Sequence, residues 1–294
     1  MTLKQALTRA NSILAANDIE DASLESELIL RHALEISRIQ LYTQLNHGLD
    51  HKQEETFWSL IKRRLRGEPT AYITGYREFY GLDFYVNPSV LIPRPESELL
   101  VEESLRLAQN HPVSTIAEIG TGCGAIAISL ALNLPQAKIY ATDISASALE
   151  VALFNCQKHR VVSKIRLIQG DMLDPLPEPV DLIVANLPYV KQSELCQMRS
   201  ANFEPRLALN GGSDGLEKIH QLCCLVSGKL RPQRCLLLEI GQGQGGAVTT
   251  FLRSLFPSAK IEVTPDLGGI DRMVSLTLTT QPPVPDQSSL NSCC

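Results

Sequence analysis

Three common features are missing from this 294-residue sequence, and each absence excludes a class of protein. No apolar run approaches the roughly 20 residues of a membrane-spanning helix. The eight cysteines include no Cys-x-x-Cys pair, so we expect neither a metal site nor a disulfide framework, and we expect a reducing, cytoplasmic environment. The excess of basic charge that favours nucleic-acid binding is also absent, since the net charge is −5.

One dense basic cluster is present at residues 62–66. An isolated cluster of this kind is typical of a solvated helix end, where basic side chains favour the negative pole of the helix dipole. Because acidic residues outnumber basic ones by 32 to 27, we expect no direct nucleic-acid partner.

The first part of the chain has the hydrophobic period of helices. Apolar residues recur at helical spacing in three stretches, 3–14, 24–34 and 57–65. We therefore predict a small helical bundle over residues 1–68. Aromatic and β-branched residues between glycines then predict a linking β-hairpin over 69–90.

Residues 91–280 alternate between strand and helix patterns. We predict strands at 115–119, 138–142, 165–169, 180–185, 235–240, 260–264 and 273–279, and helices at 124–133, 145–158, 214–230 and 246–256. This alternation predicts an α/β domain with a mostly parallel sheet covered on both faces. Residues 281–294 are polar and proline-rich and are predicted to be a disordered tail.

A turn of small residues follows the first strand of this domain and predicts a cofactor site. Its residues are Gly120, Thr121, Gly122, Cys123 and Gly124. Asp143 ends the next strand, where it can accept hydrogen bonds from two ribose hydroxyls. The spacing differs from the Gly-x-Gly-x-x-Gly of dinucleotide sites, and the preceding Glu118 suits the amino-acid end of S-adenosylmethionine.

Two further segments follow strands. Asp171 and Met172 come after the third strand, and we predict that they contact an adenine. Asp171 would accept a hydrogen bond from the exocyclic amine of the adenine, and Met172 would pack on its ring. The glycine-rich residues 239–246 follow a later strand, beyond the switch point of a doubly wound sheet. We therefore interpret them as a tight strand–helix turn, not as a second nucleotide site.

The turn formed by Asn186, Leu187, Pro188 and Tyr189 carries the predicted chemistry. It follows a buried strand and offers a side-chain carbonyl, an unsatisfied backbone carbonyl and an aromatic ring. Two acceptors beside a flat ring can hold a planar NH2 group. Together with the glycine turn, this pattern predicts methyl transfer to a planar nitrogen.

These motifs resemble the PrmC/HemK family, the enzymes that methylate the glutamine of the Gly-Gly-Gln loop in peptide chain release factors. The resemblance extends over about 69–273 and includes residues 75–81, 92–96, 120–124, 186–189, 204–205, 211–216 and 271–273. It implies a class I, Rossmann-like methyltransferase domain with a seven-stranded sheet, preceded by a substrate-binding helical domain. It also implies S-adenosylmethionine as the methyl donor, release factors as partners, and a role in translation termination for a cytoplasmic monomer.

Two residues depart from the pattern of that family. The usual Asn-Pro-Pro-Tyr has Leu187 in place of its first proline, which keeps a backbone carbonyl but loses the fixed φ of proline. Met172 stands where relatives often have an aromatic residue beside the adenine. The resemblance assigns Asn186 and the Leu187 carbonyl as acceptors of the amide N–H groups, with Tyr189 stacked on the amide plane.

Three alternatives remain open at the level of the sequence. A nucleic-acid methyltransferase acting on the amine of adenine or guanine shares the Asn186–Tyr189 motif, although neither a target-recognition domain nor a basic face is visible. A catalytically inactive module that binds adenosylmethionine would explain why Leu187 and Met172 depart from the family pattern. A nicotinamide dehydrogenase would share the glycine turn and Asp143.

Overall fold

The computed structural model describes residues 1–196 and 202–279. These residues form two compact units, one of which spans Met1–Tyr76, while the other begins at Arg77. Each unit has its own apolar core. The predicted disordered tail at 281–294 lies outside the described residues. Within the described ranges no helix is both long and apolar enough to cross a membrane.

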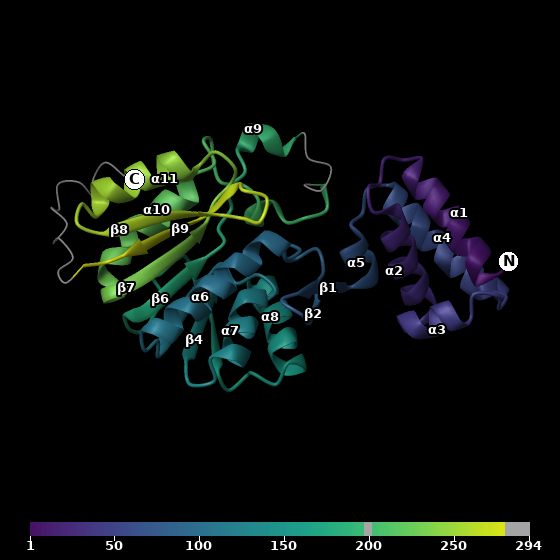
Figure 1. Cartoon of the computed structure of the whole chain (residues 1–294), viewed down its shortest axis with the longest axis horizontal. Coiled ribbons are helices and arrows are strands. Elements are labelled where there is room, and N and C mark those ends of the chain that lie inside the picture. The colour runs from purple at the N-terminus through teal and green to yellow at the C-terminus, as the bar shows by residue number, and fades with distance from the viewer. Residues whose placement is uncertain (197–201, 280–294) are drawn as a thin grey trace. The chain divides into compact units, whose positions relative to one another are not determined.

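The first unit consists of helices (Figure 1). They are α1 (Leu3–Ala15), α2 (Ala22–Leu34), α3 (Arg38–Thr43), α4 (His51–Leu65) and α5 (Thr70–Thr74). Thr2, Ser37 and Asp50 begin α1, α3 and α4 with capping boxes, in which side chain and backbone satisfy each other's free donors. Most of the apolar residues in the predicted stretches are buried or half-buried, with Leu14 and Phe57 fully enclosed, but Leu24 is 50% and Leu65 37% exposed.

The basic cluster at the end of α4 takes part in ion pairs inside this unit. The guanidinium of Arg63 pairs with Glu68, and that of Arg64 pairs with Glu25 of α2. Arg64 is only 19% exposed. Two of the four basic side chains therefore stabilise the bundle, which weakens a nucleic-acid interpretation of this segment.

The segment expected as a hairpin begins as helix, because residues 70–74 form α5. The hairpin itself is shorter, with strands β1 (Tyr76–Phe79) and β2 (Leu82–Tyr85). Tyr80 and Gly81 connect them with φ of 51° and 69°. Two positive φ angles are what a two-residue turn of type I′ requires, and this turn matches the twist of the flanking strands.

Within residues 77–196 and 202–279 a seven-stranded sheet forms, in the order β5-β4-β3-β6-β7-β9-β8. The strands are β3 (Thr115–Ile119), β4 (Lys138–Asp143), β5 (Ile165–Gln169), β6 (Val180–Ala185), β7 (Leu230–Glu239), β8 (Lys260–Pro265) and β9 (Asp271–Thr277). The first five are mutually parallel, and β9 runs antiparallel between β7 and β8. The predicted α/β sheet is confirmed.

Helices cover the sheet (Figure 1), which is why the residues of its central strands β3 and β6 are all buried and mostly apolar. In the described part of this second unit, the helices of eight or more residues are α6 (Glu98–Asn110), α7 (Ala125–Asn133), α8 (Ala146–Lys158), α10 (Glu217–Leu225) and α11 (Gly245–Leu255). Shorter helices are η1 (Pro95–Ser97), α9 (Gln192–Leu195), η3 (Arg206–Ala208) and η4 (Val226–Gly228). The strand order reverses at β3, between β4 and β6, and α/β sheets bind ligands beside such a switch point.

Candidate active site

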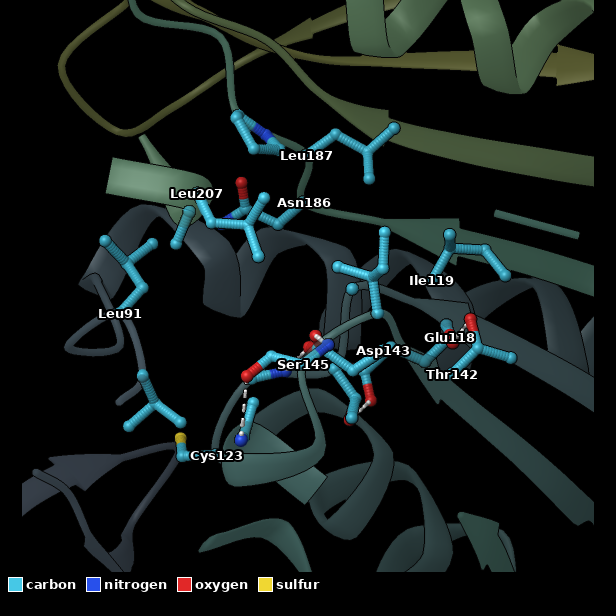
Figure 2. Close-up of a pocket in the computed structure, with 18 of the residues that line it drawn as sticks. Leu91, Glu118, Ile119, Cys123, Thr142, Asp143, Ser145, Asn186, Leu187 and Leu207 are labelled. Carbon is cyan, nitrogen blue, oxygen red and sulfur yellow. Dashed lines mark hydrogen bonds between the residues drawn. The ribbon is translucent and has the colours of Figure 1, made fainter. Parts of the chain in front are cut away.

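A cavity of about 180 Å³ opens where the parallel strands β3, β4, β5 and β6 end. Figure 2 shows Asn186 and Leu187 along one side of this pocket and Cys123, Asp143 and Ser145 along the other. Its lining includes most of the predicted site residues: Gly120, Thr121, Gly122, Cys123, Asp143, Asp171, Met172, Asn186, Leu187 and Pro188. Gly124 and Tyr189 lie outside that lining.

The glycine turn follows β3 and is held by hydrogen bonds to β4. Its three glycines have φ of 72°, 55° and 83°, which L side chains rarely adopt. The amides of Gly120 and Thr121 donate to the Thr142 carbonyl at 2.9 Å each, and that of Gly122 donates to Asp143 Oδ2 at 2.9 Å. A pyrophosphate would need such amides to be free, so this arrangement counts against a dinucleotide cofactor.

Glu118 lies at the end of β3 with its carboxylate against the pocket. Its Oε2 accepts hydrogen bonds from Thr121 Oγ1 at 2.5 Å and from the Ala127 amide at 3.0 Å. Among the described residues Oε1 has no hydrogen-bond partner, although the side chain is 2% exposed. Burial raises the pKa of Glu118 to about 8. A cation beside this carboxylate would restore its ionised form.

The two aspartates predicted to bind the cofactor lie at the carboxyl ends of neighbouring strands, Asp143 as the last residue of β4 and Asp171 two residues beyond β5. Asp143 accepts from the amides of Gly122 and Ser145 at 2.9 Å each, and burial raises its pKa. Asp171 accepts from Gln221 Nε2 at 3.1 Å, and this partner was not predicted. Met172 has φ of 44°, an unusual value for a residue other than glycine, and its side chain is buried in the sheet core.

Asn186 follows β6 directly. Its Nδ2 donates to Ser97 Oγ at 2.8 Å, while Oδ1 has no partner among the described residues. The next side chain, Leu187, is 5% exposed and belongs to the core under the sheet. A Cβ built on Gly120 would lie 3.6 Å from Leu187 Cδ2, so the leucine packs against the glycine turn.

Ser97 and Glu239 complete the site, and sequence analysis missed both. Ser97 Oγ donates to Glu239 Oε2 at 2.6 Å, and Tyr189 donates its hydroxyl to Glu239 Oε1 at 3.3 Å. Burial raises the pKa of Glu239 to about 7 and also raises that of Tyr189. The available signal was that Glu239 ends a predicted parallel strand, because such ends meet at one edge of a sheet.

The loop around residues 209–215 packs tightly against the turn. The Gly211 amide donates to the Val190 carbonyl at 2.8 Å, and Gln244 Nε2 donates to the carbonyls of Tyr189 at 3.0 Å and Gly215 at 3.3 Å. The glycine-rich segment at 239–246 therefore supports the turn after β6, in agreement with its interpretation as a structural strand–helix connection.

Two buried polar side chains tie other loops to the pocket. Glu204, 1% exposed at its side chain, pairs with Arg94 and accepts from the Ile92 amide at 3.4 Å, which gives Glu204 a structural role. Asn155 of α8 donates to the carbonyls of Tyr85 at 3.0 Å and Cys123 at 2.9 Å. It also accepts from the Tyr85 amide at 2.9 Å, so it joins the hairpin to the glycine turn.

The described ranges contain no cluster of three or more His, Cys, Asp or Glu side chains arranged for a metal. The arrangement is instead an acceptor-rich pocket. The carboxylates of Glu118, Asp143 and Asp171 and the amide of Asn186 line a cavity whose other walls are largely apolar. Such a site can bind a cationic, nucleoside-like molecule beside a planar donor of hydrogen bonds.

Comparison with known proteins gives consistent relatives along the chain. Residues 5–75 match the family described as the PrmC N-terminal domain, and 95–203 match the methyltransferase small domain. A release factor glutamine methyltransferase from Moorella thermoacetica is 44% identical over 92% of this chain and 97% of that protein. One from Koribacter versatilis is 39% identical over 93% and 98%. A methyltransferase structure from Pyrococcus furiosus shares the fold, with a TM-score of 0.51 and 18% identity over 68% of this chain and 90% of that one.

Proposed function

Because the chain belongs to the release factor glutamine methyltransferase family, we propose that it methylates the side-chain amide of the Gly-Gly-Gln glutamine in peptide chain release factors. The observation that carries this proposal is the orientation of Asn186. Its Nδ2 is occupied by Ser97, so Oδ1 is the atom left to accept a hydrogen bond from a substrate NH2 group. We expect the protein to act as a cytoplasmic monomer, with the helical unit Met1–Tyr76 binding the release factor.

The residues of the pocket fit S-adenosylmethionine, which supplies an electrophilic methyl group when bound. Glu118, which lines the pocket, offers its second carboxylate oxygen to the ammonium group, and both Asp143 oxygens keep acceptor capacity for ribose hydroxyls. Asp171, oriented by Gln221, would accept from the adenine amine, and Met172 would pack on the ring. Gly120, Thr121, Gly122 and Cys123 form the wall between these groups, and Gly124 begins the next helix.

An amide nitrogen is a weak nucleophile because its lone pair is delocalised into the carbonyl. Asn186 Oδ1 and the Leu187 carbonyl would each accept one N–H bond and hold the nitrogen toward the methyl group. Positioning of this kind can contribute several kcal/mol to catalysis. The same acceptors stabilise the positive charge that develops as the N–C bond forms and the S–C bond breaks. The proton then leaves the nitrogen for solvent.

Pro188 and Tyr189 complete the proposed substrate site. Pro188 fixes the backbone after the Leu187 carbonyl. Tyr189 anchors the end of the turn through its bond to Glu239. The predicted stacking of Tyr189 on the amide plane stays a prediction, because its ring does not line the cavity.

The experiment is transfer of a labelled methyl group from S-adenosylmethionine to a purified release factor, beside the same factor with its Gly-Gly-Gln glutamine replaced. We expect label on the first protein only. Asn186→Ala should lower turnover about 100-fold, the scale of losing one preorganised partner, while cofactor affinity stays within a few-fold. Asn133→Ala, a surface asparagine at the end of α7, is the matched control and should retain full turnover.

Failure of labelling with any release factor, despite binding of S-adenosylmethionine, would refute the proposal. Label in DNA or RNA bases instead would establish the nucleic-acid alternative. Equal loss of cofactor binding and turnover in Asn186→Ala would remove Asn186 from its assigned role.

A further inference from the structure

We propose that Glu239 is a positioning residue for methyl transfer, which acts through Ser97 to fix the side-chain orientation of Asn186 and directly on Tyr189 to fix the other end of the turn. The inference rests on the proposed function and extends it to residues that do not touch the substrate. It concerns how the chain selects one of two orientations of an amide that are nearly equal in shape.

The network joins three distant parts of the chain. Ser97 ends η1, Asn186 follows β6 and Glu239 ends β7, so the two hydrogen bonds of Ser97 span 89 and 142 residues. Ser97 is 3% exposed and Glu239 2%. Both ends of the Asn186–Tyr189 turn therefore depend on one buried carboxylate.

The direction of each hydrogen bond follows from the chemistry of Glu239. An ionised carboxylate can only accept, so the Ser97 hydroxyl must donate its one proton to Oε2. The remaining capacity of Ser97 Oγ is as an acceptor, and it accepts from Asn186 Nδ2. Asn186 Oδ1 is thereby left for the substrate.

Loss of this network would allow the Asn186 amide to rotate by half a turn. Its NH2 group would then face the NH2 group of the substrate, and two donors cannot form a hydrogen bond with each other. The negative charge of Glu239 also polarises Ser97 and, through Ser97, Asn186, which makes Asn186 Oδ1 a stronger acceptor. Both effects act on the rate of transfer and leave the cofactor side of the pocket unchanged.

The charged and titratable groups around Glu239 are Glu96 of η1, Tyr189 after β6 and Arg272 of β9. Burial and Glu96 raise the pKa of Glu239, whereas Ser97, Tyr189 and Arg272 lower it, and the result is about 7. The network needs the ionised form. Once protonated, Glu239 can donate to Ser97, and the chain of hydrogen bonds can reverse. Turnover should therefore fall as the pH decreases through about 7.

The test compares Ser97→Ala and Glu239→Gln with the unmutated protein in the methyl-transfer assay. We expect each variant to lose roughly 10- to 100-fold in kcat, the range of a charge-assisted hydrogen bond, with little change in the affinity for S-adenosylmethionine. The double variant should lose no more than the worse single one, because both changes break one network. Ser104→Ala, which removes another buried serine hydroxyl, from α6, is the matched control.

A structural role alone would not change the pH profile. The acidic limb near pH 7 should be present in the unmutated protein and absent in Glu239→Gln. An unchanged limb in that variant, or an unchanged kcat in Ser97→Ala, would overturn the inference. Variants that lose folded structure are identified by their melting temperature. In that case the pH profile of turnover in the unmutated protein still tests the proposal, because the acidic limb near pH 7 must be present there.

A readout without any release factor separates this inference from the proposed function. The side-chain NH2 signals of Asn186 in a ¹⁵N spectrum, assigned by comparison with Asn186→Asp, should titrate near pH 7 in the unmutated protein and not in Glu239→Gln. If no release factor is methylated but these signals titrate as expected, the proposed function fails and the network stands. If methylation occurs but the signals do not respond to Glu239, the network is wrong.

Discussion

Replacement of Gly211 by alanine should displace the turn that carries Asn186. A Cβ at this position would lie 2.7 Å from the carbonyl oxygens of Pro188 and Gly215 and 2.8 Å from Tyr189 Cα. Real Cβ atoms essentially never approach another atom within 3.0 Å, and all three neighbours are backbone atoms that cannot rotate away. The loop or the turn must therefore move.

The size of the effect follows from the packing. Overpacking a well-packed site costs about 1–3 kcal/mol, and a domain of this size loses about 2–4 °C of melting temperature per kcal/mol. We therefore expect Gly211→Ala to melt roughly 2–12 °C lower. Because a shift of about 1 Å in a catalytic group can cost 100-fold, kcat should also fall by about 10- to 100-fold.

Gly246→Ala is the matched control, since it makes the same chemical change in the first turn of α11. A Cβ at Gly246 would meet no atom within 4 Å. In a helix this change is expected to stabilise by up to about 1 kcal/mol. Calorimetric melting and methyl-transfer kinetics would be measured for both variants. Equal melting temperatures and equal kcat would refute the argument that loop 209–215 positions the turn.

Two further predictions concern the cofactor side of the pocket. Asn155→Ala removes three hydrogen bonds to the backbone of Tyr85 and Cys123. It should therefore destabilise the protein by about 2–4 kcal/mol in thermal unfolding and weaken cofactor binding several-fold. Unchanged cofactor affinity would show that the glycine turn keeps its shape without Asn155. Glu118 has a pKa of about 8 and is mostly protonated at pH 7, so cofactor binding should release protons, seen by calorimetry in buffers of different ionisation enthalpy. Glu118→Gln should abolish that release, and its persistence would assign the protons to another group.

Much of the cofactor site could be predicted from the sequence because its residues follow successive strands. Asp143 ends β4, and Asp171 follows β5 after two residues. Parallel strands align their carboxyl ends, so residues just beyond them meet once the alternation of strands and helices is recognised. The turn at 120–124 could also be predicted, because its small residues directly follow a strand in the sequence.

Ser97 could not be placed by such a pattern, and the strand end at Glu239 did not by itself show which strand lies beside it. Ser97 lies in a short helix outside the sheet, and Glu239 reaches the site only because β7 lies beside β6. The position of β9 between β7 and β8 also depends on strand order, which residue spacing does not encode. Helix α5 was not predicted, because the aromatic and β-branched residues in and after it favoured a hairpin.

The sequence by itself determined which side chains are available for chemistry and at which strand ends they stand. Only the tertiary structure decided how Asn186 is turned, because its amide has two orientations of nearly equal shape. The buried carboxylate of Glu239 selects between them through Ser97, over contacts that span 89 and 142 residues of the chain. A hydrogen-bond direction of this kind depends on a partner brought close by folding, and no residue near Asn186 in the chain could supply it.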